Sequence, residues 1–189
     1  MTKEDILIKS LDLFSKKGYY ATSIDEIGEA CNIKGPAIYR HYKNKEAILN
    51  AIIENIENNY AKNINQGLYI STKEEFIDFT YKMVNYTINN EMIIKSRMFL
   101  SIEQFRNEKV AKLLSFHQFD FIVSNYQKIF DNLLSLNIIE EKDTYLLAFL
   151  FTSPITLIIS LSDRKIYDKD KLNKLLEEYV NHFVKTYFK

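Results

Sequence analysis

The sequence predicts an all-α fold, in which three helices near the N-terminus are followed by a bundle of longer helices. The 189 residues include only 4 Gly and 2 Pro, too few for a β fold with many turns. Apolar residues also recur along most of the chain at the spacing of one face of an α-helix. Both observations favour helices throughout.

The first predicted helix runs from about Lys3 to Lys17. Leu7, Leu11 and Phe14 lie on one of its faces, which a core would bury. Gly18 follows and ends the helix. We expect this helix to pack behind the next two and to complete a three-helix unit.

Residues 22–46 carry the signals of two short helices joined by a tight turn. Ser23 and Glu26 have the S-x-x-E spacing of a capping box, which predicts a helix start. Asn32 stands where that helix should end, because asparagine tolerates the left-handed backbone conformation of helix ends.

The second short helix is expected to begin at Gly35 and Pro36, as N-cap and first helical residue, and to end at Tyr42. Ile38 and Tyr42 are four residues apart and should face inward. Two short helices across such a turn form a helix-turn-helix, whose second helix enters the major groove of DNA.

Basic residues gather here, although the formal net charge of the whole chain is zero. Between residues 34 and 45 the sequence has no acidic residue and four basic ones, Lys34, Arg40, Lys43 and Lys45. Such side chains bind the phosphate backbone of nucleic acids. The alternative is an ordinary helical hairpin with its basic residues on a solvated face.

This stretch resembles the N-terminal signature of the tetracycline-repressor (TetR) family. The agreement covers about the first quarter of the chain and has no gap. The agreeing residues are Phe14, Lys17-Gly18-Tyr19, Ala21-Thr22-Ser23-Ile24, Ile27, Ile33, Ile38-Tyr39-Arg40-His41-Tyr42 and Lys45-Glu46.

The resemblance implies a DNA-binding domain at residues 1–46 and a helical effector-binding and dimerisation domain at residues 47–189. It implies a homodimeric repressor that a small hydrophobic or aromatic molecule releases from a near-palindromic, double-stranded DNA operator. A helical small-molecule or lipid-binding protein without a DNA role is the competing class.

The resemblance also assigns DNA contacts to residues around the second short helix. Lys34 and Ala37 depart from the family pattern, so Lys34 adds a charge and Ala37 offers a methyl group to thymine. The assigned residues are Thr22, Ser23, Lys34, Gly35, Pro36, Ala37, Tyr39, Arg40, His41 and Lys45.

The rest of the chain is predicted to form longer helices. The first has Asn44 as N-cap and continues to about Gln66, and a loop follows at residues 67–72. The others are expected at residues 73–89, 91–106, 108–136, 144–161 and 168–187.

The helices between residues 73 and 136 are rich in aromatic residues, which is an ordinary core composition. Small-molecule sites have the same composition, and the resemblance favours a cavity in this part of the chain. The residues selected to line it are Tyr81, Met98, Phe99, Phe105, His117, Phe121 and Tyr126.

Residues 144–161 are apolar on all sides, so more than one face must be covered. A membrane span is the alternative, but the run is shorter than the ~20 residues needed, and Pro154 should kink or split it. This helix and the last one are predicted to form a four-helix interface with a second subunit, although a hairpin within one chain has the same periodicity. The interface residues are expected to be Phe149, Ile155, Ile158, Leu176, Tyr179 and Phe183.

No motif for a metal, a cofactor or a nucleophile is present. The three histidines, His41, His117 and His182, fall on separate predicted helices without metal-ligand spacing. Cys31 is the single cysteine, which fits a reducing compartment. We expect a cytoplasmic protein with no membrane partner, no cofactor and no enzymatic activity.

Overall fold

The computed structural model describes residues 1–62 and 70–189, with the backbone alone for residues 59–62. The described chain is helical almost throughout, as predicted, and packs as two compact units. Its one isolated β-bridge within these residues joins Ile139 to Phe188. The predicted helix end near Gln66 and the predicted start of a loop at Gly67 lie outside the described residues.

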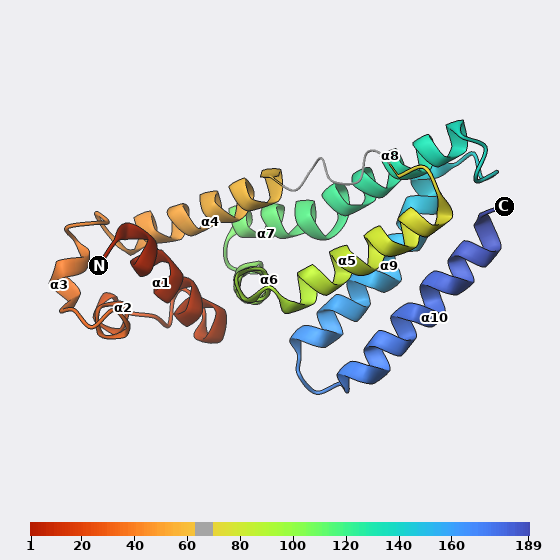
Figure 1. Cartoon of the computed structure of the whole chain (residues 1–189). Coiled ribbons are helices and arrows are strands. Elements are labelled where there is room, and N and C mark those ends of the chain that lie inside the picture. Colours follow the sequence, from red (N-terminus) through yellow and green to blue (C-terminus); the bar gives the residue numbers. More distant parts are fainter. Residues whose placement is uncertain (63–69) are drawn as a thin grey trace. The chain divides into compact units, whose positions relative to one another are not determined.

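The first unit contains the predicted three-helix head (Figure 1). Its core draws side chains from the head and from three helices later in the sequence, and the Phe14 and Phe99 rings lie 6.0 Å apart between centroids. Its helices are α1 (Lys3–Lys17), α2 (Ile24–Ala30), α3 (Gly35–Ile38), α4 (Lys45–Lys62), α6 (Glu91–Glu103) and α7 (Glu108–Ser115).

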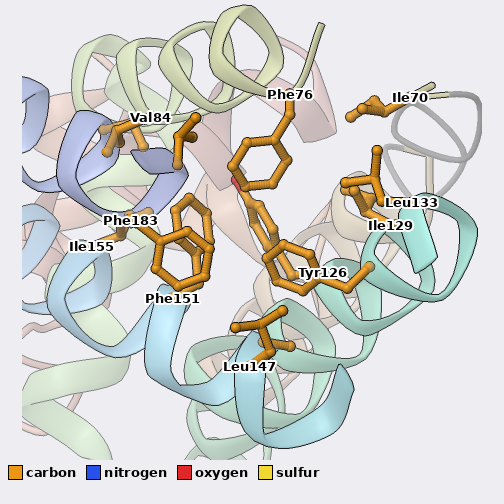
Figure 2. Packing of buried hydrophobic residues seen from close by; sticks show 14 of the residues in the cluster. Ile70, Phe76, Val84, Tyr126, Ile129, Leu133, Leu147, Phe151, Ile155 and Phe183 are labelled. Atoms are coloured by element: carbon orange, nitrogen blue, oxygen red, sulfur yellow. The ribbon is translucent and has the colours of Figure 1, made fainter. Parts of the chain in front are cut away.

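The second unit is a helical bundle around an aromatic core. It contains α5 (Lys73–Asn89), a π-helical turn (Phe116–Asp120), α8 (Phe121–Ser135), α9 (Thr144–Asp163) and α10 (Lys169–Tyr187). Rings from different helices meet at its centre, with Phe151 4.9 Å from Phe76, 4.9 Å from Tyr126 and 4.5 Å from Phe183 between centroids (Figure 2). Aromatic pairs at such separations add to the stability gained by burial.

Three predictions about the helices between residues 91 and 163 need correction. The helix expected at residues 108–136 is α7, the π-helical turn and α8, and its first part packs in the other unit. The helix expected at residues 91–106 ends at Glu103. Pro154 does not split α9, which continues through it.

A side chain from α10 compensates for the proline in α9. Proline has no backbone N–H, so the carbonyl four residues earlier, that of Leu150, loses its helical partner. The Tyr179 hydroxyl donates to this carbonyl oxygen at 2.8 Å and also lies 3.0 Å from the carbonyl oxygen of Phe151. Tyr179 therefore joins α10 to α9 at the point where Pro154 removes a backbone hydrogen bond from α9.

Among the described residues, α9 is the one helix with the length and apolarity of a membrane span. The helix is longer than predicted, since α9 has 20 residues, so its length does not exclude a membrane span. Its packing favours a core helix, because Leu147, Phe151 and Ile155 are buried in the core of the second unit. The remaining face is exposed and apolar.

The first unit extends beyond the predicted domain boundary at residues 46 and 47. Ile48 and Ile52 of α4 and Leu100 of α6 belong to the same core cluster as the three-helix head. Assigning DNA binding to residues 1–46 and effector binding to residues 47–189 remains a proposal about function.

Replacing Tyr179 with Phe should lower the free energy of unfolding by about 0.5–1.5 kcal/mol, because α9 and α10 lose the hydrogen bond that joins them. Burial raises the pKa of Tyr179, which keeps its hydroxyl protonated as a donor. Denaturant unfolding monitored by circular dichroism measures the change. Tyr167→Phe, at an exposed tyrosine, is the control, and an equal effect of both substitutions would contradict the role of the Tyr179 hydroxyl.

Candidate nucleic-acid interface

Helix α2 begins with the predicted capping box. The Ser23 hydroxyl accepts from the backbone N–H of Glu26 at 3.2 Å, and the Glu26 carboxylate accepts from the backbone N–H of Ser23 at 2.7 Å. Lys17 pairs with the same carboxylate. The hydrogen bond from Lys17, followed by those from Ser23, lowers the pKa of Glu26 to about 2. The Ser23 side chain is thus engaged in capping while the residue remains exposed.

Two glycines bring α2 and α3 close together. A Cβ on Gly28 would lie 2.8 Å from the backbone nitrogen of Gly35, and a Cβ on Gly35 would lie 2.0 Å from Oδ1 of Asp25. Asn32 has a φ of 55°, the predicted left-handed conformation. Gly28 was not among the predicted residues; its signal in the sequence is a glycine inside a short helix, a position where glycine is otherwise unfavourable.

Helix α3 presents a partly basic surface. Lys34, Pro36, Tyr39 and Arg40 are exposed, with Tyr39 54% exposed. Ala37 and His41 are half-buried, and Ile38 faces inward as predicted. The helical start is one residue earlier than expected: Lys34 is the N-cap, and Gly35 is a buried residue of the first turn. The helix ends at Ile38 rather than at Tyr42, so Tyr39 is its C-cap and Arg40 follows it.

Tyr42 is also buried, and its hydroxyl donates to the Lys3 carbonyl oxygen at 3.1 Å. Asn44 caps α4 as predicted, accepting from the backbone N–H of Ala47 at 2.8 Å. These contacts hold the chain on either side of the α3 surface against the rest of the head. The surface is therefore carried by a fixed scaffold.

Thr22 and Lys45 have partners inside the head. Thr22 is 1% exposed, and its hydroxyl donates to the Gly18 carbonyl oxygen at 2.9 Å, so its side chain is not open to phosphate. The Lys45 ammonium donates to the carbonyl oxygens of Tyr19 and Thr22, each at 2.9 Å, and lies 4.2 Å from the centroid of the Tyr19 ring. Lys45 thus joins the start of α4 to the α1–α2 turn.

The residues predicted to line a cavity do not form one group. Phe99 is fully buried in the core of the first unit, whereas Phe105 is 88% exposed. Met98 is half-buried in α6. In the second unit, Tyr126 belongs to the aromatic core, and Phe121 lies 6.2 Å from buried His117 between ring centroids.

Tyr81, one of the residues predicted to line a cavity, lines a groove in the second unit. This groove of about 320 Å³ runs along α5 and α10, a size at the small end of ligand sites. Glu177 is close enough to contribute to the raised pKa of Tyr81, after burial. The lining residues are Tyr81, Val84, Asn85, Ile88, Asn173, Leu176 and Glu177.

Most residues predicted at a subunit interface are buried within their own chain. Ile155, Ile158, Leu176 and Phe183 are at most 6% exposed in the core of the second unit, so this prediction needs correction. Phe149 is 39% exposed. The exposed apolar residues that share its helix are Tyr145, Leu146, Leu150 and Leu157.

The N-terminal segment matches known proteins. Residues 6–52 match the family model for bacterial regulatory proteins, tetR family. A 56-residue segment is 43% identical to IcaR of Staphylococcus epidermidis, a helix-turn-helix negative transcriptional regulator of the biofilm operon icaADBC. The match covers 30% of this chain and 30% of that relative, so it spans less than a third of each.

Solved structures match the fold over nearly the whole chain. A TetR-family transcriptional regulator from Mesorhizobium loti is 17% identical with a TM-score of 0.71, over 99% of this chain and 96% of that chain. SmeT, the repressor of the Stenotrophomonas maltophilia efflux pump SmeDEF, is 17% identical with a TM-score of 0.69, over 100% and 91%. A SmeT–triclosan complex matches at 16% identity and a TM-score of 0.70, over 99% and 91%.

The fold and the head define an all-helical protein with an N-terminal helix-turn-helix. The family model that matches this head and the solved structure that shares the fold of the whole chain both belong to the TetR family. Residues 6–52 thus match the N-terminal domain of the tetR family, and the whole chain shares the fold of solved TetR-family structures.

His117 should make the protein less stable in acid. Burial lowers its pKa to about 4, below the ordinary value of 6.5. The unfolded chain therefore binds a proton that the folded chain does not bind, and stability falls as the pH is lowered from about 6.5 to about 4, by as much as about 3 kcal/mol. Unfolding free energies at pH 7 and pH 4.5 should differ less in His117→Leu than in the wild type.

His182→Leu is the control, because His182 is exposed on α10. It should keep the acid sensitivity of the wild type. If His117→Leu also keeps it, His117 does not titrate as described.

Proposed function

We propose that this chain is a cytoplasmic, DNA-binding transcriptional regulator, most simply a homodimeric repressor released from its operator by a small hydrophobic or aromatic molecule. The observation that carries the proposal is the exposed, basic α3 surface on a helix-turn-helix scaffold. Among the described residues, no group of three or more His, Cys, Asp or Glu could hold a metal ion.

The charge of α3 supports DNA as the partner. Lys34 and Arg40 are exposed at its two ends, and the sequence between residues 34 and 45 contains no acid. Basic side chains and backbone N–H groups position a protein on phosphates, and a guanidinium can read guanine in the major groove. In this proposal Tyr39, Arg40 and Lys34 contact DNA from exposed positions, and Lys45 acts chiefly by holding the turn behind them.

The exposed face of α9 supports a homodimer. Leu146, Phe149, Leu150 and Leu157 are 39–56% exposed and recur at helical spacing on a helix whose other face is core. Contiguous apolar surface of this kind marks interaction sites. Burying it against the same face of a second copy gives a two-fold pair, which matches a palindromic operator.

The groove beside α5 and α10 supports an effector site in the second unit. Val84, Ile88 and Leu176 offer apolar surface, while Tyr81, Asn85 and Glu177 offer polar groups. This mixture suits a small molecule with an apolar body and a hydrogen-bonding group. SmeT, a protein with the same fold, forms a complex with the small molecule triclosan, and this is an analogy for an effector site here.

DNA binding is tested by selecting duplexes from a randomised 30-base-pair library with the purified protein, followed by gel shifts of the selected duplex. A near-palindromic consensus is the expected result. Failure to enrich any sequence at low salt would contradict the proposal and favour a helical binding protein without a DNA role.

Lys34→Ala should weaken binding to every duplex and make it less sensitive to salt. Each lost phosphate contact lowers the slope of log affinity against log salt by about one, so the loss is about two for a dimer. Fluorescence anisotropy across a salt series measures the slope. Lys128→Ala, at an exposed lysine on α8, should leave the slope unchanged, and an unchanged slope for Lys34→Ala would show that Lys34 contacts no phosphate.

Leu150→Asp should convert the dimer to single subunits, because the interface would bury an unpaired charge. Sedimentation equilibrium measures the mass, and circular dichroism checks the fold. Leu136→Asp, at a residue 48% exposed outside α9, is the matched control and should remain dimeric. A wild-type protein that sediments as a single subunit would contradict the proposed dimer.

A further inference from the structure

The end of α6 places a buried carboxylate against the head of the first unit. Glu103 is 1% exposed, and its Oε1 accepts a hydrogen bond from the backbone N–H of Tyr19 at 2.7 Å. Its Oε2 is also buried and has no hydrogen-bond partner among the described residues. One hydrogen bond therefore joins residues that are 84 positions apart in the sequence.

The turn that Glu103 contacts is shaped to receive it. Gly18 has a φ of 86°, which side-chain-bearing residues rarely adopt. A Cβ on Gly18 would lie 2.7 Å from Oε1 of Glu103, inside the van der Waals limit. Only glycine therefore allows both the bend after α1 and the approach of this carboxylate.

The same turn sets the start of two helices in the head. Tyr19, whose N–H is held by Glu103, accepts from Lys45 at the start of α4 through its carbonyl oxygen at 2.9 Å. Thr22 accepts from the same ammonium at 2.9 Å and directly precedes Ser23, the N-cap of α2. A shift of Tyr19 would therefore move the beginnings of α2 and α4 together.

A stability role alone does not account for this carboxylate. A buried carboxylate oxygen without a hydrogen-bond donor costs free energy, which offsets part of the stability that the hydrogen bond to Tyr19 contributes. Buried polar groups that lack a hydrogen-bond partner are expected at functional positions. Here the group contacts the turn on which the DNA-reading helices depend.

We propose that Glu103 is a positioning residue for DNA binding, which holds the α1–α2 turn through the Tyr19 N–H and so sets the placement of α2 and α3. This inference rests on the proposed DNA-binding function. Glu103 itself is not expected to contact DNA.

The test compares Glu103→Ala, Glu103→Gln and Gly18→Ala with the wild type. The probe is the duplex that the wild-type protein selects from the randomised library. Affinity is measured by fluorescence anisotropy, the unfolding midpoint by denaturation, and exchange of the Tyr19 amide proton by NMR. Gln104→Ala is the matched control, because Gln104 is the next residue and its amide donates to the local Ser101 carbonyl.

Glu103→Ala should weaken DNA binding by roughly tenfold, the effect of losing one charge-assisted hydrogen bond. It should remain folded under the binding conditions, as its unfolding midpoint will show, and its Tyr19 amide should exchange faster. Glu103→Gln keeps an acceptor oxygen and should recover most of the affinity. Gly18→Ala should weaken binding as Glu103→Ala does, and Gln104→Ala should behave as the wild type.

Wild-type affinity in Glu103→Ala would overturn the inference. So would a fall in affinity that a lower unfolding midpoint fully explains, or a Glu103→Gln variant as weak as Glu103→Ala. These outcomes differ from a failure of the proposed function, in which the wild-type protein itself selects no duplex.

Discussion

The close approach of α2 and α3 is the constraint on which the proposed DNA-binding surface depends. Gly28 and Gly35 leave no room for a Cβ between the two helices, and Asn32 takes the left-handed conformation that reverses the chain between them. A larger residue at either glycine would push the helices apart. With that approach in place, Ile38 and Tyr42 face the core, so Pro36, Tyr39 and Arg40 must face outward.

Polar groups in the head serve the scaffold as much as the surface. Ser23 and Glu26 cap α2, and Lys45 donates to two carbonyl oxygens of the α1–α2 turn. These bonds satisfy backbone groups that a helix end or a turn leaves without partners. Of the four basic residues between positions 34 and 45, Lys45 is engaged in this way, and Lys34, Arg40 and Lys43 remain exposed for a nucleic acid.

In the second unit the aromatic core decides which surface stays exposed. Phe151 meets Phe76, Tyr126 and Phe183 on one side of α9, and Tyr179 binds the carbonyl group that Pro154 leaves without a helical partner. The opposite side keeps Phe149 and Leu150 exposed. A helix that is apolar on all sides thus divides into a face for its own core and a face suited to a second subunit.

The sequence by itself determined the features that depend on near neighbours. The capping box of α2, the turn at Asn32, the cap at Asn44 and the inward Ile38 all follow from spacings of four residues or fewer. Tertiary structure alone decided the partners of Lys45, the pairing of Tyr19 with Glu103, and which apolar face of α9 is core. Periodicity shows that a face is apolar, but the partner that covers it comes from a distant part of the chain.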